Sequence, residues 1–145
     1  MRVGKGDEIL HTTLGSCVGI ALLWHDRRLC ALAHCLLPEP LTGPGLPTAK
    51  YVTDAVPSLL QLIGAEPSQH AKLQAIVAGG ACMISPGRPL PYGLIGEQNT
   101  QMARHLLAGA GIRVVYTDTG GSNGRQLSID CRTQQYAVRT FEHIG

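Results

Sequence analysis

Apolar residues along the chain fall into short blocks that polar or glycine-rich links separate, a pattern typical of layered α/β proteins. Residues 17–24 are apolar and partly β-branched, which predicts a buried strand. Residues 25–28 form a polar link, and residues 29–36 predict a second strand that ends before Pro38. Because the link is short and polar, we expect the two strands to pair as a β-hairpin.

Two helices are expected after this hairpin. Thr48 can cap a helix that runs to about Ile63, and Gly64 supplies its stop signal. Pro57 lies inside this pattern and should kink or split the helix, because it lacks a backbone N–H. Residues 97–108 predict a second helix, which places its apolar side chains inward.

Further strands alternate with these helices, and loops rich in proline or glycine connect them. Strands are expected at residues 73–78, 112–116, near 126–131 and 135–140, and loops at residues 38–47, 85–96 and 119–124. This mixed order predicts an α/β or α+β layered sandwich, with a mixed, largely antiparallel β-sheet core and helices packed outside. The length of 145 residues suits one domain over residues 1–145.

Composition narrows the range of functions. The hydrophobic fraction of 44% argues against disorder, and the aromatic fraction of 4% leaves too few rings for a base-stacking surface. The net charge is only +2 and the basic residues do not cluster, so nucleic acid is not an expected partner. The N-terminus lacks a signal-peptide pattern, and the longest uncharged apolar stretch, residues 18–24, is too short to span a bilayer. We therefore expect a cytoplasmic protein without membrane insertion.

The five cysteines are odd in number and irregularly spaced, which predicts free thiols rather than a disulfide framework. Free cysteines are usually small buried apolar residues. We therefore expect four of them, Cys30, Cys35, Cys82 and Cys131, to be packing residues.

The predicted hairpin places the fifth, Cys17, on the same sheet face as His34. If the turn centres near residues 25 and 26, the numbers of each cross-strand pair add to an odd sum, so Cys17 lies opposite or diagonal to His34. Their Cβ atoms would be about 5 Å apart if directly opposite and about 7 Å apart if diagonal. A one-residue bulge would instead send the two side chains to opposite faces.

A cysteine and a histidine within hydrogen-bonding reach are the minimal arrangement for thiol nucleophilic catalysis. The His34 imidazole would accept the thiol proton of Cys17, and the resulting ion pair would hold the thiolate near neutral pH. On spacing alone, such residues on adjacent strands are more often packing residues, so the catalytic interpretation needs independent support.

The residues just before Cys17 could complete such a site. Gly15 permits a sharp turn, and backbone N–H groups around Gly15 and Ser16 could bind a developing oxyanion. Thr12 or Thr13, slightly further upstream, could orient the imidazole or bind substrate.

Three other kinds of site fit the sequence less well. Residues 15–19 have the outline of a nucleophile elbow, but an elbow needs a helix after the nucleophile and here an apolar strand follows. Cys30, His34 and Cys35 could be zinc ligands, but no C-x-x-C occurs and strand alternation puts Cys35 on the opposite face from the other two. The glycine-rich segment 120–124 lacks the Lys-Ser/Thr of a phosphate-binding P-loop, so a strand connection is favoured.

Six short motifs, in order and at appropriate spacing, make the chain resemble the CheD family of chemoreceptor glutamine deamidases over most of its length. The motifs are Leu-Gly-Ser-Cys-Val at 14–18, Ala-His-x-Leu-Leu-Pro at 33–38, Lys-Tyr-x-x-Asp-Ala-Val at 50–56, Ala-Gly-Gly-Ala-x-Met at 78–83, Ile-Gly-Glu-Gln-Asn at 95–99, and Asp-Thr-Gly-Gly at 118–121 with Gly-Arg at 124–125. Gln98 stands where the family has arginine, and the proline-rich loop at 38–47 replaces a more polar stretch.

The resemblance implies a protein that converts selected glutamines of methyl-accepting chemoreceptors to glutamates in bacterial chemotaxis. It makes Cys17 the nucleophile and His34 its base, with a threonine as third catalytic residue. Thr12 is the counterpart we assign, and Thr13 remains possible because the segment before the cysteine is one residue shorter than in the family. The implied fold is a layered α/β sandwich, also found in bacterial toxins that deamidate Rho-type GTPases. Some members of the family bind the phosphatase CheC, which occupies the active site.

The implied reaction passes through a thioester on Cys17 and uses His34 for proton transfer, so no metal or organic cofactor is required. Two alternatives remain open at this point. One is a non-catalytic adaptor that binds chemoreceptors or a CheC-type phosphatase. The other is a related cysteine hydrolase or transglutaminase that acts on glutamines of another protein.

Overall fold

The computed structural model of the chain describes residues 1–35, 52–81 and 95–141. The predicted loop at 38–47 and the predicted helix cap at Thr48 lie outside these ranges, as does Cys82.

A five-stranded sheet forms the centre of the molecule, with strand order β1-β4-β3-β5-β6. Its strands are β1 (Arg2–Lys5), β3 (Val18–Trp24), β4 (Leu29–Cys35), β5 (Gln74–Gly79) and β6 (Arg113–Thr119). The pairs β1–β4, β3–β4 and β3–β5 are antiparallel, and only β5–β6 is parallel. The parallel pair has a register shift between Ala75 and Ile76.

A second, three-stranded antiparallel sheet has the order β2-β7-β8. It consists of β2 (Ile9–Leu14), β7 (Gly124–Asp130) and β8 (Gln135–Phe141). The two sheets pack face to face, and their contact is a cluster of small and branched apolar side chains. The fully or almost fully buried members of this inter-sheet cluster are Leu10, Leu14, Ala21, Leu23, Cys30, Leu32, Ile76, Ala78, Leu127, Ile129 and Cys131.

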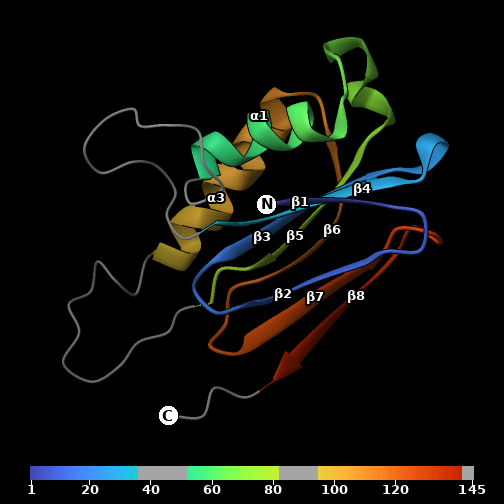
Figure 1. The fold of residues 1–145 in the computed structure, drawn as a ribbon. Helices are drawn as coiled ribbons and strands as arrows, with labels where there is room; N and C mark the ends of the chain where they lie inside the picture. Colours follow the sequence, from blue (N-terminus) through green and yellow to red (C-terminus); the bar gives the residue numbers. More distant parts are fainter. Residues whose placement is uncertain (36–51, 82–94, 142–145) are drawn as a thin grey trace.

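Helices α1 (Val52–Ile63) and α3 (Ile95–Gly109) cover the other face of the five-stranded sheet, so the molecule has a helix layer and two sheet layers (Figure 1). Two short 3-10 helices complete the described elements, η1 (His25–Arg27) and η2 (Pro67–Lys72). This architecture confirms the predicted layered sandwich, with the addition of a second sheet. No helix in the described ranges combines the length and apolar character that crossing a bilayer requires.

Helix α1 runs without a break through Pro57, so the predicted split does not occur. Pro57 is exposed and is the sixth of the 12 residues of this helix, where the missing N–H removes one bond, that to the carbonyl of Thr53. The predicted stop at Gly64 is confirmed, because this residue adopts a φ of 76° directly after the helix.

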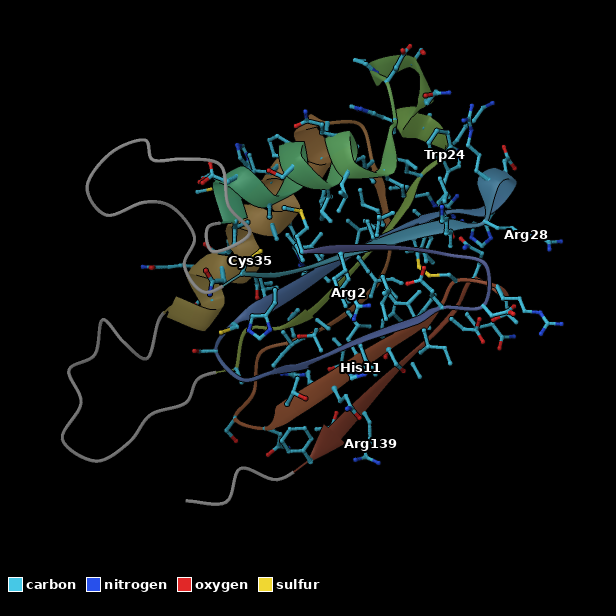
Figure 2. All side chains as sticks on the ribbon, in the orientation of Figure 1. Arg2, His11, Trp24, Arg28, Cys35 and Arg139 are labelled. Atoms are coloured by element: carbon cyan, nitrogen blue, oxygen red, sulfur yellow. A yellow bond between two sulfur atoms is a disulfide. The ribbon has the colours of Figure 1, made fainter. Side chains whose placement is uncertain are left out.

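The β3–β4 hairpin is confirmed, and its strands are buried on both faces because each side of the sheet carries another layer. Val18, Ile20, Leu22 and Trp24 face the helices, whereas Ala21 and Leu23 face the second sheet. The turn is the 3-10 helix η1, which ends at Arg28 in the left-handed conformation (φ 51°). Trp24 and Cys35 mark opposite ends of the hairpin (Figure 2).

The two N-terminal strands, β1 and β2, were not predicted. β1 contains Gly4 and begins and ends with a charged residue, Arg2 and Lys5, which weakens its strand signal. β2 carries a detectable alternation, since Leu10 and Leu14 are buried and His11 and Thr13 are exposed. Each strand is an edge strand, so its pairing depends on partners far along the chain.

The expectation that all cysteines are free thiols is wrong for Cys30 and Cys131, which form a disulfide between the two sheets (Figure 2, yellow bond). Their Cα atoms are 5.6 Å apart although 101 residues separate them in sequence. Spacing along the chain could not reveal this pair, because only the packing of one sheet on the other brings them together. Cys35 is buried against the helices and remains free, as predicted.

Candidate functional site

Cys17 lies in a three-residue link, Gly15–Cys17, that carries the chain from the small sheet to the large one. β2 ends at Leu14 and β3 begins at Val18, so the link crosses the open end of the sandwich. The Cys17 side chain is half-buried and packs against the inter-sheet cluster. One side of the Cys17 thiol therefore packs against the core, and the other side remains accessible to solvent.

The register of the hairpin sets the relation between Cys17 and His34. Val18 pairs with Cys35 and Gly19 with His34, so the residue numbers add to an odd sum, as predicted. Cys17 packs against the inter-sheet cluster, which also contains Leu32, two residues before His34 on β4, so both Cys17 and His34 lie on the face that looks toward the second sheet. Gly19, directly across from His34, has no side chain that could compete for this space. In the part of the chain that the structure describes, no hydrogen bond joins the Cys17 thiol to the His34 ring.

Thr12 contacts His34 across the two sheets. Its Oγ1 atom lies 2.8 Å from His34 Nδ1, a hydrogen bond that links β2 with β4. Thr13, the other candidate, is exposed and lies on the opposite face of β2. Because Thr12 engages Nδ1, the remaining ring nitrogen, Nε2, is the atom available for proton exchange with a thiol.

Burial favours the uncharged forms of both Cys17 and His34. Desolvation raises the pKa of the Cys17 thiol above its ordinary value of 9.0, and the residue's own backbone N–H opposes this shift. Desolvation lowers the pKa of His34 below 6.5, and the Met1 ammonium group adds to the shift. The resting pair near neutral pH is therefore a thiol and a neutral imidazole. The thiolate–imidazolium pair expected from the sequence is not the form that this environment favours.

Three hydrogen bonds from other elements hold the carbonyl groups of the link. The Gly80 N–H donates to the Cys17 carbonyl at 2.8 Å, and the Ala81 N–H donates to the Gly15 carbonyl at 3.0 Å. The Asn99 Nδ2 atom, from the first turns of α3, donates to the Ser16 carbonyl at 3.1 Å. Since every carbonyl of the link is bonded, the link has little freedom to rotate.

Glycines at the end of β5 allow this close contact. Gly79 and Gly80 adopt positive φ values of 102° and 65°, which favour glycine. A Cβ atom on Gly79 would collide with the Cys17 carbonyl oxygen, and one on Gly80 would lie 2.7 Å from the Gly96 carbonyl oxygen. Both positions therefore require glycine for backbone conformation and for space.

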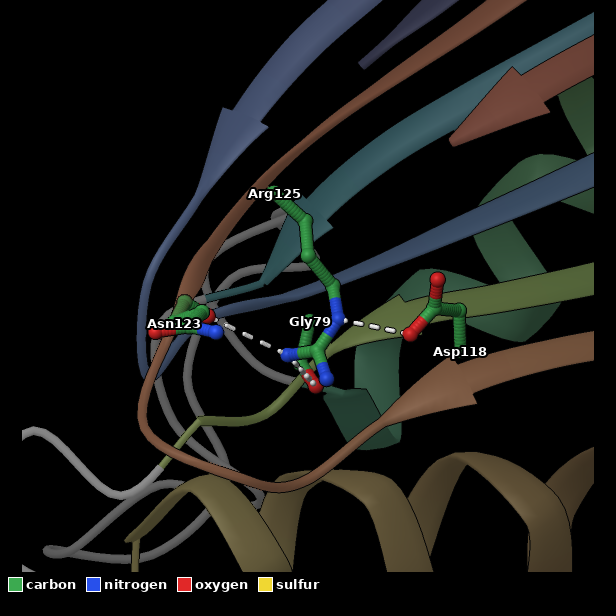
Figure 3. A network of polar contacts seen from close by, with 4 residues as sticks. All are labelled: Gly79, Asp118, Asn123 and Arg125. Atoms are coloured by element: carbon green, nitrogen blue, oxygen red, sulfur yellow. Dashed lines mark hydrogen bonds and ion pairs between the residues drawn. The ribbon is translucent and has the colours of Figure 1, made fainter. Parts of the chain in front are cut away.

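Arg125 joins the two sheets beside this turn (Figure 3). From β7 of the small sheet, its Nε atom donates to Asp118 Oδ1 on β6 at 2.8 Å. Its Nη1 atom donates to the carbonyls of Gly79 and Asn123, both at 3.3 Å. The guanidinium group is almost fully buried, so these bonds compensate its loss of hydration. Arg125 thereby fixes the end of β5 that supports the Cys17 link.

The other sites considered from the sequence do not form around these residues. A strand, β3, follows Cys17, as expected for a site that is not a nucleophile elbow. Cys30 faces the second sheet and Cys35 faces the helices, so they cannot share one metal ion. Residues 120–123 connect β6 with β7, and Gly124 is the first residue of β7, so the glycine-rich segment is a strand connection, as favoured.

Sequence reasoning did not identify Asn99, Arg125 or Gly79 as site residues. Each lies in a motif that carried the family resemblance, and that was the only available signal. Their positions along the chain do not show that they converge on Cys17, because the contacts span between 46 and 83 residues.

Comparisons with known proteins show which proteins this chain is similar to. Residues 36–140 match a family model described as "CheD chemotactic sensory transduction", a range that begins after Cys17 and His34. A relative from a Ruegeria species, "Probable chemoreceptor glutamine deamidase CheD 2", is 31% identical over all of this chain and 90% of its own length. "Probable chemoreceptor glutamine deamidase CheD" proteins from Bdellovibrio bacteriovorus and Pyrococcus horikoshii are each 39% identical. Their alignments cover 88% and 94% of this chain, and 81% and 85% of the relatives.

Proposed function

The chain belongs to the CheD family, and from this premise we propose that it is a protein-glutamine deamidase that hydrolyses glutamine side chains of methyl-accepting chemoreceptors. The observation that carries the proposal is the Thr12–His34 hydrogen bond beside the Cys17 link, because it orders a base next to a half-buried thiol. We assign Cys17 as nucleophile, His34 as general base and acid, and Thr12 as the residue that orients His34.

The first half of the reaction forms a thioester. His34 Nε2 accepts the thiol proton while Cys17 Sγ attacks the amide carbon of the glutamine side chain, and the carbonyl π electrons move onto oxygen. The resulting imidazolium keeps its Nδ1–H bonded to the Thr12 hydroxyl. When the tetrahedral intermediate collapses, the C–N bond breaks and the proton on Nε2 transfers to the leaving nitrogen, which departs as ammonia.

The second half hydrolyses the thioester. Neutral His34 accepts a proton from water, whose oxygen attacks the thioester carbon. The C–S bond then breaks, the proton returns from His34 to sulfur, and the new carboxylic acid leaves and gives up water's second proton to the released ammonia, which leaves glutamate and ammonium. The balance is one glutamine side chain and one water converted to one glutamate side chain and one ammonium ion, with Cys17 and His34 restored.

The oxyanion of both tetrahedral intermediates needs a donor close to Cys17 Sγ. The backbone N–H of Cys17 suits this role, because it lies near enough to its own sulfur to oppose the rise in thiol pKa. Gly15 and Ser16 support this donor, because their hydrogen-bonded carbonyls fix the backbone of the link directly before Cys17. A preorganised donor of this kind typically contributes a few kcal/mol to transition-state stabilisation.

The substrate implies the location and partners. The glutamines lie on cytoplasmic domains of chemoreceptors, so we place the protein in the cytoplasm. A phosphatase of the CheC type is a candidate partner that would compete for the same opening.

The test is mass spectrometry of a purified chemoreceptor cytoplasmic domain after incubation with wild-type protein, Cys17→Ala or Cys35→Ala. Cys35→Ala is the matched control, because it removes the buried free thiol at the same end of the hairpin. We expect glutamine-to-glutamate conversion, a mass increase of about 1 Da per site, with wild type and Cys35→Ala only. Conversion by Cys17→Ala at a near-normal rate would refute the nucleophile assignment. Receptor binding without conversion by any variant would instead identify a non-catalytic adaptor.

A further inference from the structure

Asn99 is a fully buried polar residue on α3 that bonds to the backbone directly before Cys17. Its Nδ2 atom donates to the Ser16 carbonyl at 3.1 Å, across 83 residues of sequence. A buried amide is costly unless it is hydrogen bonded. Asn99 is the only one of the three residues bonded to the link carbonyls that acts through its side chain, since Gly80 and Ala81 act through backbone N–H groups.

The carbonyl that Asn99 binds belongs to the same peptide group as the Cys17 N–H. A peptide group is planar, and the structure contains no cis peptide bond in its described ranges. In a trans peptide the N–H points opposite to the C=O. A bond that fixes the Ser16 oxygen toward α3 therefore directs the Cys17 N–H away from α3.

We propose that Asn99 is a positioning residue for the deamidation reaction, because it fixes the Ser16–Cys17 peptide plane and thereby aims the Cys17 N–H at the developing oxyanion. This inference rests on the proposed function. The bond to the Ser16 carbonyl also polarises the peptide group, which strengthens its N–H as a donor. The neighbouring bonds from Gly80 and Ala81 hold the link in place but leave the middle peptide free to tilt if Asn99 is lost.

Asn99→Leu tests the role, because leucine keeps the branched side-chain shape but has no donor. Asn99→Ala is the second variant, for the case that leucine does not fit. The matched control is Gln134→Ala. Gln134 is also a buried amide that donates to two backbone carbonyls, those of Leu29 and Cys131, but it lies at the other end of β4 from His34.

Steady-state kinetics on a receptor cytoplasmic domain separate positioning from stability. For folded Asn99→Leu we expect kcat to fall about 10- to 100-fold with KM changed less than about twofold. The reason is that a misdirected Cys17 N–H weakens stabilisation of the transition state but not binding of the substrate. We expect Gln134→Ala to lower the melting temperature about as much as Asn99→Leu does. Its kcat per folded molecule should stay at the wild-type value. A kcat within about twofold of wild type in both Asn99 variants, or an equal fall in Gln134→Ala, would overturn the proposal.

A second readout does not depend on the receptor. The rate of Cys17 alkylation by iodoacetamide, followed by mass spectrometry against pH, reports how the Cys17 N–H stabilises its own thiolate. The midpoint of this pH profile is the pH at which the alkylation rate is half its maximum. We expect this midpoint to move to higher pH in Asn99→Leu and to stay at the wild-type value in Gln134→Ala. If wild-type protein converts no receptor glutamine, the proposed function fails, and the alkylation midpoint alone then decides whether Asn99 positions the peptide. An unchanged midpoint in Asn99→Leu counts against it.

Discussion

The hydroxyl of Thr12 and the Nδ1 atom of His34 lie 2.8 Å apart, although 22 residues separate them and their strands belong to different sheets. The sandwich itself thus brings together the imidazole that we propose as the base and the hydroxyl that we propose orients it. A shift of one sheet relative to the other would therefore change this distance even if each sheet kept its own structure.

Thr12→Val should lower kcat/KM for receptor deamidation by about 5- to 10-fold, which corresponds to the loss of one hydrogen bond worth about 1 kcal/mol. Valine keeps the shape of threonine but cannot accept the Nδ1–H of His34, so the ring loses its fixed orientation. Thr13→Val is the control, because Thr13 is exposed on the opposite face. A larger effect of Thr13→Val than of Thr12→Val would transfer the role to Thr13.

The pH dependence of kcat/KM should reflect the shifted pKa values of Cys17 and His34, which are both uncharged near neutral pH. Because burial lowers the pKa of His34, the base form persists below pH 6.5, and activity should fall only as pH drops through this lowered pKa. Because burial raises the pKa of Cys17, the thiol persists above pH 9.0, so alkylation by iodoacetamide should rise only in that range. Burial raises the pKa of Cys35 to about 12, so its alkylation should be slower still. An alkylation midpoint for Cys17 below pH 7 would show a preformed ion pair instead.

Gly79→Ala should lower both stability and activity, since alanine meets the Cys17 carbonyl oxygen and must adopt a φ of 102°. Gly64→Ala is a matched control with a φ of 76° and open space around it. We expect Gly64→Ala to cost about 1 kcal/mol in the free energy of unfolding, from the left-handed conformation alone, without loss of kcat. Gly79→Ala should cost clearly more in urea unfolding and reduce kcat. Equal costs for the two substitutions would mean that the turn does not support the Cys17 link.

Arg125→Ala should reduce the free energy of unfolding by about 2–3 kcal/mol, because it removes charge-assisted bonds and leaves Asp118 and the Gly79 carbonyl without this partner. Asp118→Asn keeps an acceptor for Arg125 Nε and should cost less. Urea unfolding of the three proteins measures the difference. A loss as large in Asp118→Asn as in Arg125→Ala would show that the ion pair, rather than the bond to Gly79, dominates.

Much of the fold could be predicted from local sequence. The hairpin predicted at 17–36 is specified by two apolar blocks and a short polar link. The position of the turn also predicted that the residue numbers of each cross-strand pair add to an odd sum. The helices and strands that follow are also found close to their predicted bounds, because apolar periodicity and glycine stop signals are local properties. Pro57 was overestimated as a helix breaker, because the helix continues through it with the loss of one backbone hydrogen bond.

Local sequence was enough to predict the strands of the hairpin and the common face of Cys17 and His34, because side-chain alternation along paired strands needs no tertiary information. Tertiary packing was needed to choose between Thr12 and Thr13 as the contact of His34, to pair Cys30 with Cys131, and to bring Asn99 to the Ser16 carbonyl. These contacts join residues that are 22 to 101 positions apart, and they form only when two sheets and a helix pack together. Packing of this kind is set by the whole core at once, so no local pattern encodes it.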